Sequence, residues 1–145
     1  MISLLPQIRQ WAERGVYKSM GEYKVIIPGR FPSLNEFVEA NRIHKQKGNK
    51  MKQESQNLIS LYLMQQHRKL HIDRPVTLHY SYYEPNKKRD LDNISGYFHK
   101  VFQDALVNYG ILHNDSWYYI TGFTDDFFID NKNPRIEVII QEVGK

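Results

Sequence analysis

Residues 76–110 read VTLHYSYYEPNKKRDLDNISGYFHKVFQDALVNYG, and this stretch decides the fold. Its first part alternates, which predicts a strand over residues 76–84 with one face made by Val76, Leu78, Tyr80 and Tyr82. After Asp92, apolar residues recur at spacings of three and four, which predicts an amphipathic helix whose buried face contains Ile94, Tyr97, Phe98, Val101, Phe102, Ala105 and Leu106. Gly110 is the expected end of that helix.

Weaker patterns on both sides complete the fold. Residues 53–69 have helical spacing, and Ser33 or Asn35 is the expected N-cap of another helix that starts nearby. Residues 23–28, 117–124 and 135–142 predict further strands, with residues 125–134 as the connection between the last two. Residues 3–14 predict a short amphipathic helix. We therefore expect an α+β fold, in which a small mixed sheet of about four strands packs with two main helices. Residues 1–20 would be an N-terminal helical extension, and residues 21–145 the main domain.

Length and composition exclude several classes of protein. A chain of 145 residues suits one compact domain. It has no cysteine, which excludes disulfides, thiolate metal sites and cysteine nucleophiles. We see no signal peptide and no apolar run of about 18 residues, so we expect a cytoplasmic protein that does not enter a membrane.

Charge is segregated along the chain. Lys and Arg number 20 against 16 acidic residues, and the net charge is +4. Cations concentrate in residues 42–52 (RIHKQKGNKMK) and 87–89 (KKR), whereas acids concentrate in the last third. This pattern is compatible with a polyanionic partner.

The most chemically distinctive segment is KKRDLDN, in which Asp90 and Asp92 flank Leu91. If the segment is extended, both carboxylates face one way and Leu91 turns toward the core. If Asp92 starts the helix, it still projects beside Asp90. Two carboxylates this close repel each other unless a cation or a proton lies between them, and Mg²⁺ prefers such oxygen ligands. The alternative is that Asp92 is only a helix N-cap.

Other polar residues could join this site. Asp115 lies in the turn HNDSW, where it either completes a metal site or only shapes the turn with Asn114. Lys100 follows Asp92 by about two helical turns, so it either stabilises phosphate charge or is a solvated surface lysine. His99 is either a general base or a polar surface residue.

Several of these segments together resemble the RusA-type Holliday junction resolvases. They are RDLDN, the helical K-x-x-x-D-A-L from Lys100 to Leu106, the N-D pair before a strand, and the early IPGRFPSLNEF. The likeness runs from about Tyr23 to about Glu142. Four more residues separate the aspartate pair from the lysine than in the best-known member, which is close to one helical turn.

The resemblance implies a homodimeric, Mg²⁺-dependent endodeoxyribonuclease, with Mn²⁺ as a possible substitute, that acts on four-way DNA junctions in recombination and repair. The metal-binding and catalytic carboxylates would be Asp90, Asp92 and Asp115, and the catalytic lysine would be Lys100. No small-molecule cofactor is implied. Because the family often occurs in phage and prophage genomes, a role in phage DNA processing is also implied.

The chemistry that we expect is hydrolysis of a DNA phosphodiester on a metal-activated water. Phosphate contacts independent of sequence would come from Lys45, Lys47, Lys50, Lys52, Lys87, Lys88 and Arg89. A twofold dimer would supply the two cuts that resolve a junction. The alternatives are a nuclease for other branched DNA such as flaps or forks, a non-catalytic module that binds branched DNA, and a purely structural protein.

Overall fold

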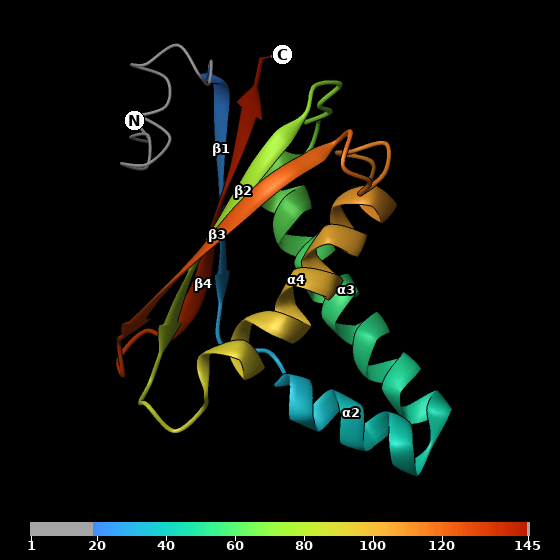
Figure 1. The fold of residues 1–145 in the computed structure, drawn as a ribbon, viewed down its shortest axis with the longest axis vertical. Helices are drawn as coiled ribbons and strands as arrows, with labels where there is room; N and C mark the ends of the chain where they lie inside the picture. Colours follow the sequence, from blue (N-terminus) through green and yellow to red (C-terminus); the bar gives the residue numbers. More distant parts are fainter. Residues whose placement is uncertain (1–18, 145) are drawn as a thin grey trace.

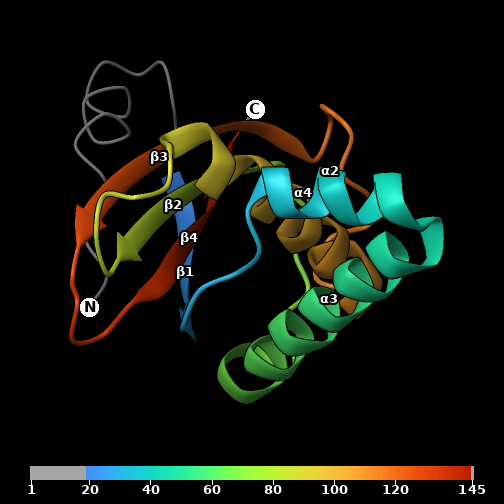
Figure 2. The same cartoon turned by 90° about the horizontal axis from the view of Figure 1, so that it is seen from below.

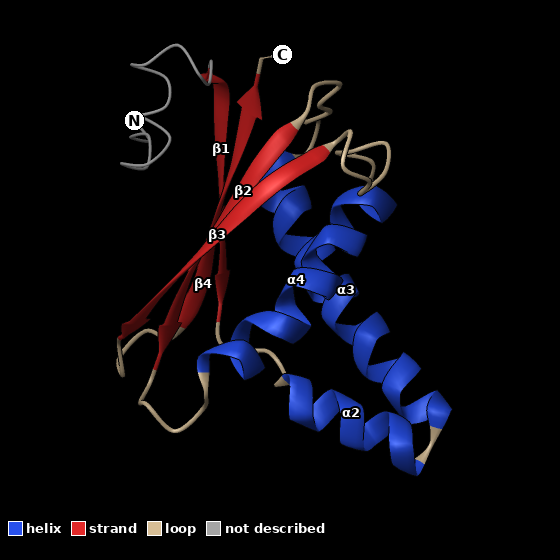
Figure 3. Cartoon of the chain, in the orientation of Figure 1, coloured by secondary structure: helices blue, strands red, loops and turns tan. Residues whose placement is uncertain are grey.

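The computed structural model describes residues 19–144. Within that range, three helices lie on one face of a four-stranded sheet (Figures 1 and 3). The elements are β1 (Ser19–Pro28), α2 (Leu34–Ile43), α3 (Lys45–His67), β2 (Val76–Glu84), α4 (Leu91–Tyr109), β3 (Ile120–Ile129) and β4 (Arg135–Val143). The α+β class and the mixed sheet expected from the sequence are confirmed. The helix expected at residues 3–14 lies outside the described residues.

The strand order is β1-β4-β2-β3, so β1 and β3 are the edges of the sheet. Strand β4 pairs antiparallel with both β1 and β2, and Val138 lies opposite Val25 on one side and Tyr80 on the other. Strand β3 pairs parallel with β2, with Asp125 opposite Tyr80. Helix α4 is the crossover that a parallel pair requires, and it therefore lies between β2 and β3 in the chain.

The core lies between α4 and the sheet. Every residue of the predicted apolar face of α4 is buried, and so are the four predicted core positions of β2. The rings of Phe98 and Phe102 meet that of Tyr80 edge-on, at centroid distances of 5.9 and 5.8 Å. Such geometry suits the charge distribution of aromatic rings, and it fixes α4 against β2 over most of its length.

Local signals fix where the helices begin and end. Ser33 is the N-cap of α2, as expected, and forms a reciprocal capping box with Glu36. Gly110 ends α4 in the left-handed conformation, with φ of 98°. None of the helices described is long and apolar enough to cross a membrane.

Three boundaries differ from the prediction. Strand β1 begins at Ser19 instead of at residue 23. Helix α3 begins at Lys45, upstream of the expected 53–69, and its buried Gly48 lies directly against Asn41. Strand β3 covers 120–129 instead of 117–124, so the expected connection through 125–134 is wrong. The acidic residues in that segment have low strand propensity, but pairing with β2 along the whole strand outweighs it.

Candidate active site

Asp90 and Asp92 lie together at the start of α4. Asp90 is the N-cap residue, with φ of −70° and ψ of 151°, and Asp92 lies in the first turn. The positive end of the helix dipole stabilises carboxylates at both positions. Asp92 is therefore not the N-cap, and Asp90, which is, makes no side-chain capping hydrogen bond. Because the helix starts at Leu91, the extended alternative for this segment is wrong.

Both carboxylates are available for a ligand. They are exposed, and within residues 19–144 neither side chain has a hydrogen bond or an ion pair. Leu91 between them was expected to face the core, but the start of the helix turns it outward and leaves it 57% exposed. The pair is thus an unneutralised negative site, and its chemistry suits a hard divalent cation.

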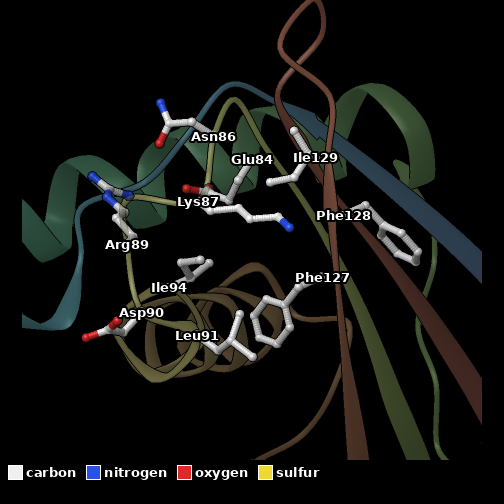
Figure 4. Close-up of a pocket in the computed structure, with 10 residues that line it drawn as sticks. All are labelled: Glu84, Asn86, Lys87, Arg89, Asp90, Leu91, Ile94, Phe127, Phe128 and Ile129. Carbon is white, nitrogen blue, oxygen red and sulfur yellow. The ribbon is translucent and has the colours of Figure 1, made fainter.

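A cavity of about 430 Å³ opens beside Asp90 (Figure 4). Its apolar wall comes from the start of α4 and the end of β3, with Leu91, Ile94 and Phe127. In Figure 4, Lys87 reaches across the cavity toward β3, and the carboxylate of Asp90 points away from the apolar wall. One rim of the cavity therefore carries the acidic group and another carries a cation.

The loop that positions Asp90 is tied to α2 and to the segment before it. The guanidinium of Arg89 donates to the carbonyl oxygen of Phe31 and to Glu36, each at 2.8 Å. Glu84, which is buried, pairs with Arg30 at 2.8 Å. Arg89 therefore has a structural partner, whereas Lys87 and Lys88 have no ion pair within the described part of the chain.

Asp115 lies beyond the opposite end of α4. It is exposed and lines a second cavity, of about 340 Å³, with Gln103, Trp117 and Phe123. Asn114 shapes the turn, since its side-chain oxygen accepts the backbone N–H of Ser116 at 2.9 Å. A helix of 19 residues is about 28 Å long. One chain therefore does not bring Asp115 to Asp90 and Asp92.

Two further observations agree with this separation. Among residues 19–144, no group of three His, Cys, Asp or Glu side chains could hold a metal ion. Lys100 also lies apart from the pair: its side chain is 63% exposed and approaches Asp104 at 3.9 Å. Eight residues of helix place it about 12 Å along the axis from Asp92.

A histidine–aspartate pair lies between the two cavities. His99 Nε2 is 2.7 Å from Asp125 Oδ1, and the Tyr82 hydroxyl donates to the same oxygen at 3.0 Å. Burial, followed by the charge of Asp125, raises the pKa of Tyr82, so the hydroxyl stays protonated. This pair could not be predicted from the sequence, because only the parallel register of β2 and β3 turns Asp125 toward α4.

The remaining predicted DNA contacts lie on α3. Lys45, Lys47 and Lys50 are exposed and Lys52 is partly so, all in the first three turns of the helix. Lys50 approaches Glu54 at 3.9 Å. Figures 1 and 2 show that this corner between α2 and α3 projects away from the sheet. These cations form an arm separate from the Asp90 site.

The sequence was also compared with known proteins. The family model described as "Endodeoxyribonuclease RusA" matches residues 12–141, which is most of the chain. No curated protein matched it. The matched range contains both carboxylates at the start of α4, the loop with Asp115 and all four strands except the last residues of β4. The family model and the fold agree with the likeness seen in the sequence motifs, and this chain therefore belongs to the RusA family of endodeoxyribonucleases.

Proposed function

We propose that this protein is a Mg²⁺-dependent Holliday junction resolvase that cuts two strands of the junction as a homodimer. The family supports endonuclease activity on DNA. The observation that carries the proposal is the pair of carboxylates Asp90 and Asp92 at the start of α4, whose side chains have no partner within residues 19–144. They lie beside a loop that carries Lys87 and Lys88, which form no ion pair in the part of the chain that the structure describes.

The donor set fits a magnesium ion. Mg²⁺ is bound by one or two carboxylates, with water and substrate phosphate in the other positions. Asp90 and Asp92 meet that need and have no competing partner within residues 19–144. When bound, the ion would acidify a water and neutralise charge on the phosphate and the leaving oxygen. Mn²⁺ would substitute, since it accepts the same ligands.

The chain's own residues would bind and orient the DNA. Lys87 and Lys88 are close enough in sequence to Asp90 to contact phosphates next to the scissile one. The lysines at the start of α3, residues 45, 47, 50 and 52, would grip an arm of the junction without reading its sequence. Lys100 would meet a phosphate only if the strand runs along α4. Arg89 would instead keep the loop in place through Glu36.

A second copy of the chain would complete the site. Since Asp115 lies at the far end of α4 from Asp90 and Asp92, we propose that the partner subunit's Asp115 approaches this pair. A twofold dimer then has two equivalent sites, which matches two incisions in a nearly symmetric junction. Paired incisions follow from this symmetry.

The first test is cleavage of a synthetic four-way junction with Mg²⁺, alongside flap and fork substrates. We expect paired symmetric nicks in the junction. Asp90→Asn should abolish cutting and leave binding intact, whereas Asp126→Asn, on the exposed outer side of β3, should cut normally. A wild-type protein that is inert with every metal and junction sequence would refute the proposal, and preferential cutting of flaps or forks would change its substrate.

The second test asks whether the site is shared. Asp90→Asn and Asp115→Asn chains should each be inactive alone. Mixed chains form heterodimers in which one site has all three aspartates and the other has lost two. We therefore expect the mixture to nick one strand but not to make paired cuts. If mixing restores nothing, Asp115 does not act across the dimer.

A further inference from the structure

The two cavities lie at opposite ends of the line along which α4 faces β3, which we call the α4–β3 seam. The first cavity is lined by Ile94 of α4 and Phe127 of β3, and the second by Gln103 and Phe123 of the same two elements. His99 lies midway between the two α4 residues in sequence, and Asp125 lies midway between the two β3 residues. The hydrogen-bonded His99–Asp125 pair is thus the centre of the seam on both elements.

Two copies of the chain could pair face to face through this seam. If the twofold axis between them passes by the His99–Asp125 pair at right angles to the seam, it exchanges the two ends of the seam. The first cavity of one protomer then faces the second cavity of the other. Such a self-complementary contact is what a twofold interface requires.

The second cavity carries an unusual side chain. Trp117 lies two residues after Asp115 and is 93% exposed, more than any other large apolar residue in the described part of the chain. Within residues 19–144 its indole makes no ring contact or hydrogen bond. Tryptophan buries a large area when it finds a pocket and is enriched among the anchors of protein interfaces.

The first cavity has the chemistry to receive an indole. Leu91, Ile94 and Phe127 give it an apolar wall, and its volume of about 430 Å³ lies in the range of pockets that bind ring systems. Lys87 reaches across it (Figure 4), where its ammonium can lie over an aromatic face. The charges are also complementary, because Lys87 of one protomer would face the carboxylate of Asp115 of the other protomer.

We propose that Trp117 of each protomer docks into the cavity between α4 and β3 of a second copy, as the central anchor of a twofold dimer. The proposal rests on the proposed function, since docking of Trp117 is what carries Asp115 toward Asp90 and Asp92 of the other chain. Two buried indoles contribute roughly 300–500 Å². The exposed Leu91, Phe123 and Ile129 extend the area toward the ~1,200 Å² of a stable interface.

The test measures the dissociation constant of the dimer by analytical ultracentrifugation, without metal or DNA. Trp117→Ala and Leu91→Arg should each raise it by roughly 30-fold or more, as loss of an interface anchor does. Trp117→Phe should recover part of the affinity. Leu61→Arg, at a 43% exposed position of α3, is the matched control and should dimerise normally. Circular dichroism checks that each variant is folded.

A mixing experiment keeps the proposal falsifiable even if one variant dimerises poorly for other reasons. A Trp117→Ala chain keeps its cavity, and a Leu91→Arg chain keeps its tryptophan, so their heterodimer retains one intact contact. Native mass spectrometry should show more heterodimer than either homodimer. A dimeric Trp117→Ala protein, or a mixture with no excess of heterodimer, would overturn the proposal.

Two other outcomes are also decisive. If Trp117→Ala stays dimeric and loses only junction affinity, the indole contacts DNA bases and the docking proposal is wrong. If the dimer behaves as expected but no junction is cut under any condition, the docking contact stands and the proposed activity fails. The two proposals can therefore fail separately.

Discussion

His79 shows how the fold fixes the charge of a single residue. The side chain is only 4% exposed, with Nε2 2.9 Å from the hydroxyl of Thr77 and Nδ1 2.7 Å from that of Thr124. Burial lowers the pKa of His79 to about 4. Two hydroxyl partners suit a neutral ring, which donates through one nitrogen and accepts through the other. The folded protein therefore keeps His79 uncharged at neutral pH.

This makes stability depend on pH. In the unfolded chain His79 takes up a proton as the pH falls below 6.5, whereas in the folded chain it is protonated only near pH 4. The stabilisation is present above pH 6.5 and is lost as the pH falls toward 4. We expect the contribution of His79 to the free energy of unfolding, measured by urea titration, to be about 2 kcal/mol smaller at pH 5 than at pH 7. His79→Gln should lack this component, and an equal loss in the variant would mean that other groups are responsible.

At the scale of single elements, the N-terminus of α2 is connected to the loop that carries Asp90. Glu36 accepts both the backbone N–H of Ser33 and the guanidinium of Arg89. The capping box of a helix and the tether of the loop that carries Asp90 thus share one carboxylate. A change at the start of α2 should reach the site through this residue.

Ser33→Ala removes the hydroxyl that accepts the N–H of Glu36. We expect the free energy of unfolding to fall by about 1 kcal/mol, as for other lost N-caps. Ser60→Ala, within α3, is the control and should not destabilise the protein, because alanine is the better helix former. Urea titrations of the two variants measure the difference, and equal midpoints would show that the cap contributes nothing.

For the whole molecule, the proposed shared site predicts that metal binding and dimerisation are coupled. Three carboxylates that met across the proposed interface would repel one another unless a cation lay between them. Mg²⁺ should therefore lower the dissociation constant of the dimer, and a chelator should raise it. Asp115→Asn should make the dimer less dependent on Mg²⁺. Ultracentrifugation with and without Mg²⁺ measures this, and a wild-type dimer indifferent to the ion would refute the coupling.

The projecting α3 arm predicts a salt effect on DNA binding. The slope of log K against log salt counts the phosphates that a protein neutralises. Lys47→Ala with Lys50→Ala should reduce that slope by about two and weaken binding to any junction sequence alike. Lys69→Ala, just past the other end of α3, should leave the slope unchanged. Equal slopes in all three proteins would place the DNA elsewhere.

Local features of the fold could be predicted from the sequence, whereas features that depend on contacts between distant residues could not. The buried face of α4 and the core side of β2 were predicted correctly, because periodicity alone determines which residues share a face. The predicted position of β3 was wrong, because Asp125 and Asp126 are residue types typical of loops, and only the pairing with β2 shows that they lie in a strand. The same register decides that Asp125 meets His99, so that pair was not predicted.

The candidate site divides in the same way. Asp90 and Asp92 lie together because only Leu91 separates them, and their spacing in the sequence was enough to predict this. Whether Asp115 joins them depends on the length and direction of α4. Asp115 follows the C-terminal end of this helix, whereas Asp90 and Asp92 lie at its N-terminal end, so the three do not meet within one protomer. A symmetric partner is information that no single-chain pattern contains.

The sheet order has a consequence for how the protein is made. Strand β4 is the last element described, yet it lies between β1 and β2 and forms hydrogen bonds with both. A nascent chain on the ribosome therefore carries β1 without a strand partner until β4 has emerged. Until then, β1 exposes unpaired backbone that another chain could recruit. We expect a ribosome-bound fragment that ends at Asn133 to remain open to proteases along β1, and protection to appear only when β4 is released.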